Sequence, residues 1–171
     1  AERIIETIVS ETGKTWEDAQ IAEISYAANA FGFWAKNAEK YLADERVRSS
    51  ALLLKGKKLI LRYKPLGLVG VIGPWNYPFY LSVAPLVAAI SAGNCAVLKP
   101  SELAPATSEL LTELIPKYLD NQAIRVIEGD GGTTQNLIAQ GFDHVLFTGG
   151  TEIGRKIMAA AAPTLTPVTL E

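Results

Sequence analysis

The stretch GLVGVIGPWNYPFY, residues 67–80, joins an uninterrupted apolar run to a segment crowded with proline and aromatic residues. A continuous apolar run such as residues 67–73 is typical of a strand that is covered on both faces of a sheet. Pro74 and Pro78 then restrict the backbone on either side of Asn76. Asn76 is therefore expected in a stiff frame, just beyond the end of a buried strand.

The pattern of an apolar run followed by a helical segment repeats toward the C-terminus. Strands are predicted at residues 67–73, 94–100, 123–129, 144–150 and 167–171, with helices at 79–92, 106–119, 133–140 and 152–161. Strands that alternate with helices form an open parallel sheet with right-handed crossovers. The expected fold is therefore α/β, with a Rossmann-like parallel sheet and flanking helices over residues 66–171, and ligands are expected beyond the carboxyl ends of its strands.

The first 50 residues are predicted to be helices that pack on this sheet domain. Residues 1–12 are the first helix, and a second begins near Thr15, a candidate N-cap with Asp18 three positions later. Apolar residues at three- and four-residue spacing predict one buried stripe on the second helix. The stripe is Ile21, Ile24, Ala28, Phe31, Ala35, Ala38 and Leu42, and Phe33, Trp34 and Tyr41 widen it.

Residues 51–65 are predicted to form a β-hairpin. The segments ALLL, 51–54, and LILRY, 59–63, are its expected strands, joined by a turn at residues 55–57. Lys57, Lys58, Arg62 and Lys64 decorate it. Lysines on an edge strand discourage stray pairing, but the same hairpin could be an oligomerisation arm that pairs with another subunit. The sequence leaves both interpretations open.

Composition excludes several classes of function. The chain has 171 residues, a net charge of −2, 49% hydrophobic and 20% charged residues, and the two signs are interspersed. Without a basic stripe, a nucleic-acid partner is not expected. One cysteine and one histidine cannot build a zinc site, and the longest apolar run, 77–92, is too broken to span a membrane. The absence of a charged leader favours a cytoplasmic location.

Polar residues follow two of the predicted strands. Asn76 could donate its rigidly held amide to a developing oxyanion, or it could cap the helix that starts near Pro78. Lys99 and Glu102 could bind ribose hydroxyls, or they could form a loop salt bridge with Ser101 or Thr107 as a helix cap. The residues alone do not choose between these alternatives.

Glycine-rich turns follow two other strands. In FTGGTEIGR, 147–155, a strand runs through a glycine turn into a helix N-terminus, a geometry that suits a pyrophosphate. Gly149 and Gly154 have the outer spacing of a G-x-G-x-x-G motif, but Thr151 replaces its middle glycine. The segment EGDGG, 128–132, is expected to be a tight turn. Cys95 is expected to be a small buried residue, and His144 is expected to be structural or on the surface.

Four blocks in this order resemble the NAD(P)-dependent aldehyde dehydrogenase superfamily. They are GVIGPWNYPF, AGNCAVLKPSE, FTGGTEIGR and the final TLE, within residues 66–171. The resemblance implies that a cysteine thiolate attacks an aldehyde, that hydride passes to the nicotinamide, and that water hydrolyses the thioester. It also implies a site in which Asn76 holds the oxyanion and Glu171 is the general base. The implied cofactor-binding residues are Ile72, Pro74, Trp75, Lys99, Ser101, Glu102, Gly132, Phe147, Thr148, Gly149, Gly150 and Ile153.

The resemblance places the nucleophilic cysteine beyond Glu171, in a catalytic domain outside this chain. Cys95, the only cysteine, matches a buried strand position of the family instead. Residues 1–171 alone are therefore expected to form no NADH from an aldehyde. The sheet face toward the missing domain would then expose apolar surface, so residues 1–171 are expected to form an oligomer, a complex with the remaining part or an aggregation-prone fragment. A homo-oligomer is expected in the full-length form.

Two further alternatives remain open at this point. The chain could be a truncated, non-catalytic nucleotide-binding or assembly module of the same fold. An acyl-forming relative that transfers to coenzyme A is disfavoured, because it needs no deacylating glutamate at position 171.

NAD is the expected cofactor because Glu102 would repel a 2′-phosphate, although Lys99 could offset that repulsion and allow NADP.

Overall fold

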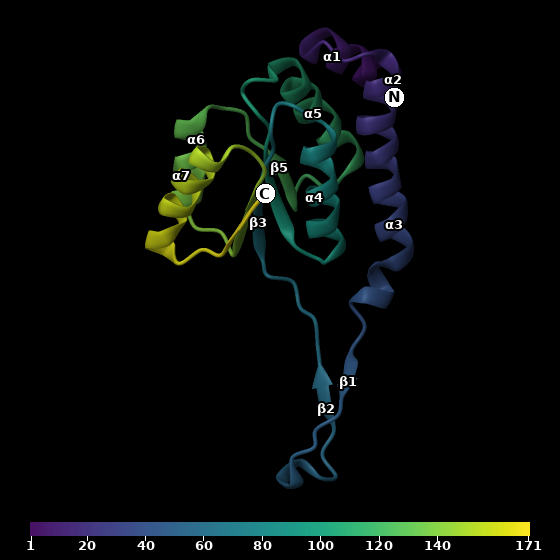
Figure 1. Cartoon of the computed structure of the whole chain (residues 1–171), viewed down its shortest axis with the longest axis vertical. Helices are drawn as coiled ribbons and strands as arrows, with labels where there is room; N and C mark the ends of the chain where they lie inside the picture. The colour runs from purple at the N-terminus through teal and green to yellow at the C-terminus, as the bar shows by residue number, and fades with distance from the viewer.

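The structure, a computed structural model, describes all 171 residues and is built on a five-stranded parallel sheet (Figure 1). The strand order is β5-β4-β3-β6-β7. The strands are β3 (Leu68–Ile72), β4 (Cys95–Lys99), β5 (Ile124–Val126), β6 (His144–Phe147) and β7 (Val168–Leu170). Each lies within a predicted strand, and the α/β fold class is confirmed. The central strand β3 carries the first apolar run, and Ile72 pairs with Lys99 on one side and Phe147 on the other.

Helices cover both faces of the sheet. On one face, α4 (Tyr80–Ser91) and α5 (Pro105–Tyr118) lie side by side, and on the other lie α6 (Gly131–Ala139) and α7 (Thr151–Ala161) (Figure 1). A short 3-10 turn, η3 (Ala162–Thr164), follows α7. Leu98 is fully buried against the α4 and α5 side, and Ile138 is fully buried on the other. Apolar residues on both strand faces explain why the predicted runs do not alternate.

The N-terminal region contains α1 (Glu2–Thr12), α2 (Trp16–Asp18), the π-helix η1 (Ala19–Ser25) and α3 (Tyr26–Tyr41). In the structure, α1 lies against α5, and α3 runs along α4 (Figure 1). Thr15 caps the second helical segment as predicted, because its side chain accepts from the Asp18 backbone N–H at 3.1 Å.

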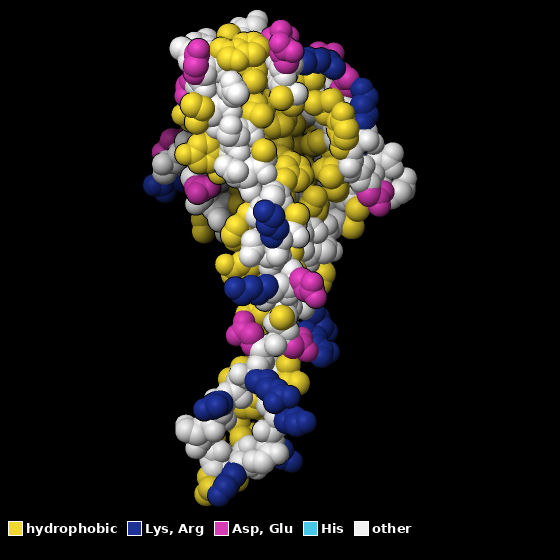
Figure 2. All heavy atoms as spheres, turned by 90° about the vertical axis from the view of Figure 1, so that its right-hand side faces the viewer, with side chains coloured by type: hydrophobic (Ala, Val, Ile, Leu, Met, Phe, Trp, Pro, Cys, Tyr) yellow, Lys and Arg dark blue, Asp and Glu magenta, His cyan; other side chains and the backbone are white.

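The predicted apolar stripe packs only in part: Ile24 is half-buried against Ile5, Ile8 and Ala19, whereas most other positions of the stripe are exposed. Ile21, Phe31 and Leu42 are exposed, and the buried positions are Ala19, Glu23 and Ala27. The wider turn of the π-helix changes the register of the following helix, so a 3.6-residue period starting at Ile21 selects a face that is mostly exposed. Figure 2 shows hydrophobic side chains gathered on the side of the body on which α3 lies.

The hairpin prediction is wrong in its first strand. Strand β1 (Glu45–Val47) pairs antiparallel with β2 (Leu59–Leu61), and residues 52–54 form the 3-10 turn η2 (Leu52–Leu54). Hydrogen bonds to the Ala51 and Leu52 carbonyls close this turn within the loop, so the leucine run needs no partner strand. The hairpin projects from the body as an arm, with Lys and Arg side chains along it (Figures 1 and 2).

Cys95 is exposed, which corrects the expectation that it is buried. It is the first residue of β4, and the neighbouring strand β5 begins to pair only at Ala96. The Cys95 side chain therefore lies at the uncovered amino end of the sheet, away from the polar residues at the carboxyl ends. His144, at the start of β6, places its Nε2 3.0 Å from the hydroxyl of Thr169. None of the helices combines the length and apolar character needed to cross a membrane.

Candidate active site at the carboxyl edge of the sheet

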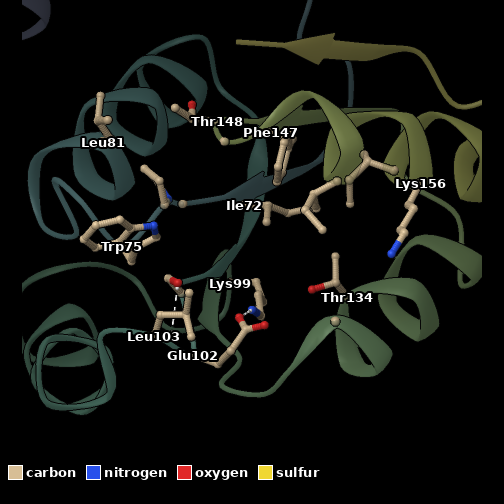
Figure 3. Close-up of a pocket in the computed structure, with 18 of the residues that line it drawn as sticks. Ile72, Trp75, Leu81, Lys99, Glu102, Leu103, Thr134, Phe147, Thr148 and Lys156 are labelled. Atoms are coloured by element: carbon tan, nitrogen blue, oxygen red, sulfur yellow. Dashed lines mark hydrogen bonds and ion pairs between the residues drawn. The ribbon is translucent and has the colours of Figure 1, made fainter.

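A cavity of about 640 Å³ opens where β3, β4, β6 and β7 end. Figure 3 shows Ile72 near its middle, with Trp75 and Leu81 to one side and Thr134 and Lys156 to the other. The lining residues are Ile72, Gly73, Pro74, Trp75, Asn76, Leu81, Lys99, Ser101, Glu102, Leu103, Gly131, Thr134, Gln135, Phe147, Thr148, Gly149, Gly150, Ile153, Lys156, Ile157 and Glu171. Parallel strands bring their carboxyl ends to one edge, so residues nearly a hundred positions apart meet here.

All of the predicted site residues except Gly132 line this cavity, and its neighbour Gly131 does so instead. Sequence reasoning missed the side chains of the second helical turns, chiefly Thr134, Gln135 and Lys156. The signal was available, because residues three and four positions after a helix start lie on the same face as the start. Gly131 with Thr134 and Gln135, and Ile153 with Lys156, have this spacing.

Asn76 presents an amide donor to the cavity. Its side-chain Oδ1 accepts from the Tyr77 backbone N–H at 3.1 Å, and its amide nitrogen has no partner within the chain. The alternative of a helix cap is wrong, since α4 starts only at Tyr80 and its first N–H groups are held by Glu23. Asn76 is therefore fixed through its oxygen and free to donate through its nitrogen.

Lys99 and Glu102 form an ion pair at the end of β4 (Figure 3). The Lys99 side chain is buried, whereas that of Glu102 is 43% exposed. Partial burial acts to raise the pKa of Glu102, but hydrogen bonds from Lys99 and the backbone, with the Lys99 charge, hold it below its usual range. The Ser101 hydroxyl accepts from the Leu103 N–H at 3.2 Å, and the Thr107 hydroxyl donates to Glu11. Neither hydroxyl therefore acts as the cap of α5. The pair thus presents a partly exposed, ionised carboxylate to the cavity.

The four helices that follow strands differ at their amino ends. Free backbone N–H groups at such an end bind anions. Glu23 occupies the start of α4, Glu11 accepts from the Ala106 and Thr107 N–H groups at the start of α5, and Asp130 caps α6. The N–H hydrogen bonds to Asp130 lower the pKa of its carboxyl. Only α7, which begins after Gly150, has no side-chain cap, and its start lines the cavity.

The turn before α7 requires glycine at position 149. A Cβ atom there would lie 2.5 Å from the ring of Phe147, closer than packed atoms approach. Gly150 has open space around it, so the backbone is accessible from the cavity. The Gly149 N–H donates to the Glu171 carbonyl at 3.0 Å, and the Glu171 N–H donates to the Phe147 carbonyl at 3.0 Å. These bonds fix Glu171 beside the turn.

The fold belongs to the class of open parallel α/β sheets, and its cavity lies at the carboxyl edge beside an uncapped helix N-terminus. A comparison with sequence models of protein families identifies the family. The family model described as the aldehyde dehydrogenase family matches residues 1–171, and the chain belongs to this family.

Similar proteins agree with this assignment. The chain is 45% identical over 168 residues to aldehyde dehydrogenase family 3 member H1 of Arabidopsis thaliana, covering 98% of the chain and 34% of the relative. It is 41% identical over 170 residues to family 3 member B2 of Mus musculus, covering 99% of the chain and 35% of the relative. The chain thus spans about a third of the length of the curated relatives it matches.

A solved structure has almost the same fold. The substrate-bound state of Staphylococcus aureus AldH superposes with a TM-score of 0.95 at 37% identity, covering 99% of this chain and 37% of that one. A lactaldehyde dehydrogenase structure superposes with a TM-score of 0.88 at 30% identity, covering 99% of this chain and 35% of that one. In both cases the likeness includes the N-terminal helices and the arm as well as the sheet.

Proposed function

We propose that these residues form the cofactor site and part of the active site of an enzyme that oxidises an aldehyde to a carboxylic acid with NAD(P)+. One observation carries the proposal: a single cavity contains an amide donor at Asn76, a carboxylate at Glu171 and an uncapped helix N-terminus at α7. These are the groups that oxyanion stabilisation, general-base catalysis and pyrophosphate binding require. Family membership supports the same reaction.

The residues present fit a dinucleotide. The uncapped start of α7 offers backbone N–H groups and the positive end of the helix dipole to a pyrophosphate. Lys156 lines the same region and belongs to no ion pair, so its charge is available to a phosphate. The nicotinamide of a bound cofactor supplies the hydride acceptor for the oxidation. Trp75, which is 55% exposed, offers a flat apolar surface to the substrate and nicotinamide end.

Within this site, Asn76 would donate its free amide N–H to the oxygen that becomes negative when the aldehyde carbon is attacked. Glu171 would take a proton from the water that hydrolyses the acyl enzyme. The nucleophile itself is not among residues 1–171.

The activity is tested with the natural gene product that contains residues 1–171. Purified protein is mixed with NAD+ or NADP+ and with aliphatic and aromatic aldehydes, and cofactor reduction is followed by absorbance. Aldehyde-dependent reduction is expected. A natural product that binds NAD+ but reduces it with no aldehyde would contradict the enzyme proposal and favour the non-catalytic module.

NAD is the proposed cofactor in preference to NADP, and Glu102 is the proposed cause. Its partly exposed carboxylate would face the adenosine ribose and repel a 2′-phosphate. We expect Glu102→Gln to raise the ratio of kcat/KM for NADP+ to that for NAD+ by about tenfold. The matched control is Glu109→Gln, which neutralises an exposed carboxylate on α5 outside the cavity. An unchanged ratio in Glu102→Gln would show that the carboxylate does not face the 2′ position.

Homo-oligomerisation is also proposed. Leu52 and Leu53 at the tip of the arm are 81% and 93% exposed, and α3 exposes Phe31, Phe33 and Tyr41. Exposed apolar groups of this size are typical of surfaces that bind another chain. Gel filtration of the natural gene product at micromolar concentration tests this, and a clean monomer would contradict it.

A further inference from the structure

A buried ion pair lies behind the Asn76 loop, outside the cavity. The Lys14 ammonium donates to Oε1 of Glu23 at 2.6 Å, the Lys14 side chain is 12% exposed and Glu23 is fully buried. A buried ion pair loses hydration, and it is tolerated only when further hydrogen bonds satisfy both partners. The other hydrogen bonds of Lys14 and Glu23 therefore show which parts of the chain the ion pair connects.

The second oxygen of Glu23 holds the start of α4. Glu23 Oε2 accepts from the backbone N–H of Phe79 at 3.0 Å and from that of Tyr80 at 2.9 Å. These donors have no partner inside the helix, and the helix dipole favours a negative charge at this end. The carboxylate thus fixes the residues that directly follow Pro78.

Lys14 holds the backbone of Asn76, two residues before Pro78. Its ammonium also donates to the backbone carbonyl oxygen of Asn76 and lies 4.1 Å from the centroid of the Tyr77 ring. One ion pair therefore binds Asn76, Tyr77 and the first turn of α4 together. The side chain of Asn76 projects from this anchored backbone into the cavity.

The local sequence explains how the pair is placed. Gly13 ends α1 in the left-handed conformation at φ 73°, and Thr15 caps the next helix, so Lys14 is held between two helix ends. Glu23 lies in the π-helix η1, and it is buried between Ala19 of the same helix and Ala27 of the following helix α3, at four-residue spacing. A π-helix is rare and is often found at functional sites.

We propose that Lys14 and Glu23 are positioning residues that hold the Asn76 amide where the oxyanion develops. The proposal rests on the oxyanion role proposed for Asn76. An oxyanion donor acts because it is already in place when charge develops, so loss of its anchor weakens it. A displacement of about 1 Å from a remote change can cost about a hundredfold in rate.

The first test is the double variant Lys14→Met with Glu23→Gln in the natural gene product. It removes both charges together, so neither is left buried without a partner. The glutamine can still accept one N–H of α4, but the link to the Asn76 carbonyl is lost. We expect kcat to fall on the order of ten- to a hundredfold, with KM for NAD+ unchanged. Lys14→Arg, which keeps the cation, should retain most of the activity.

The control for a general loss of packing is Glu11→Gln. Glu11 is also a carboxylate of the N-terminal helices that caps a helix of the sheet domain, but it caps α5 rather than α4. It is expected to retain kcat at saturating cofactor. An equal fall of kcat in Glu11→Gln and in the double variant would overturn the proposal.

A double-mutant cycle with Asn76→Ala gives the decisive kinetic comparison. If the pair acts through Asn76, Lys14→Met with Glu23→Gln should cost nothing further once the amide is gone. The same fold loss in both backgrounds would show that the pair acts elsewhere and would overturn the proposal.

Hydrogen exchange of the peptide covering residues 74–81 reads the anchor without any catalysis. Faster exchange at Phe79 and Tyr80 is expected in Glu23→Ala, and no change is expected there in Glu11→Gln. Unchanged exchange in Glu23→Ala would overturn the anchoring role even if the enzyme is active. If exchange became faster in Glu23→Ala but the natural gene product oxidised no aldehyde, the anchoring role would stand and the proposed reaction would be wrong. The catalytic part of this inference would then be overturned.

Discussion

Replacing Asn76 by Ala is expected to lower kcat for aldehyde oxidation by about a hundred- to a thousandfold. The backbone around Asn76 is held by Pro74, Pro78 and the Lys14 contact, and its side-chain oxygen is occupied by the Tyr77 N–H. Its amide nitrogen is therefore a donor that needs little reorganisation. The affinity for NAD+ should change little, because the proposed contacts to the pyrophosphate and the adenosine ribose, at α7, Lys99 and Glu102, do not involve the Asn76 side chain. Steady-state kinetics and a fluorescence titration with NAD+ measure the two quantities.

The control for the Asn76 prediction is Asn76→Asp, which keeps the shape but replaces the donor with a negative acceptor. We expect a loss at least as large as in Asn76→Ala. If Asn76→Asp kept wild-type kcat, the donor role of Asn76 would be untenable, and the residue would have to be regarded as a loop-forming asparagine.

Replacing Glu171 by Gln is expected to lower steady-state turnover by about 10²–10⁴-fold while the first turnover remains fast. The carboxylate is proposed to activate the water that hydrolyses the acyl enzyme, and hydride transfer precedes that step. A rapid burst of NADH followed by a slow phase is the kinetic sign of an accumulating acyl enzyme. Stopped-flow absorbance separates the two phases.

Added hydroxylamine sharpens the Glu171 test, because it attacks an acyl enzyme without needing a general base for water. It should restore much of the turnover in Glu171→Gln. The matched control is Glu152→Gln, an exposed carboxylate in the first turn of α7 whose side chain is 86% exposed. If the burst amplitude and the steady-state rate fell equally, Glu171 would act at or before hydride transfer. That result would contradict its role in hydrolysis.

The sheet could be predicted from the sequence because its strands are continuous apolar runs between glycine-rich turns. The same reasoning located the site, since the carboxyl ends of parallel strands must meet. The strand order β5-β4-β3-β6-β7 lay outside the prediction, because apolar runs such as 67–73 and 144–150 carry no signal for their neighbours. Thr134, Gln135 and Lys156 were missed because the glycine-rich motifs end at the turns, whereas these side chains lie one helical turn further along the same face.

The N-terminal region could not be predicted equally well, for a physical reason. Periodicity selects apolar residues, but the buried face of η1 contains Glu23, whose carboxylate is satisfied by backbone N–H groups more than fifty residues away. A partner that distant leaves no local pattern. The prediction of the hairpin's first strand was also wrong, because residues 51–54 have a strand-like composition but form a 3-10 turn.

The most direct test of the account is a crystal structure of the natural gene product with NAD+ bound. We expect the pyrophosphate at the uncapped amino end of α7 beside Gly150, the adenosine ribose hydroxyls against Lys99 and Glu102, and the nicotinamide directed toward Asn76. A pyrophosphate bound at the start of α4, α5 or α6, with its carboxylate cap displaced, would contradict the proposed site. A structure without bound cofactor at saturating NAD+ would contradict the cofactor assignment itself.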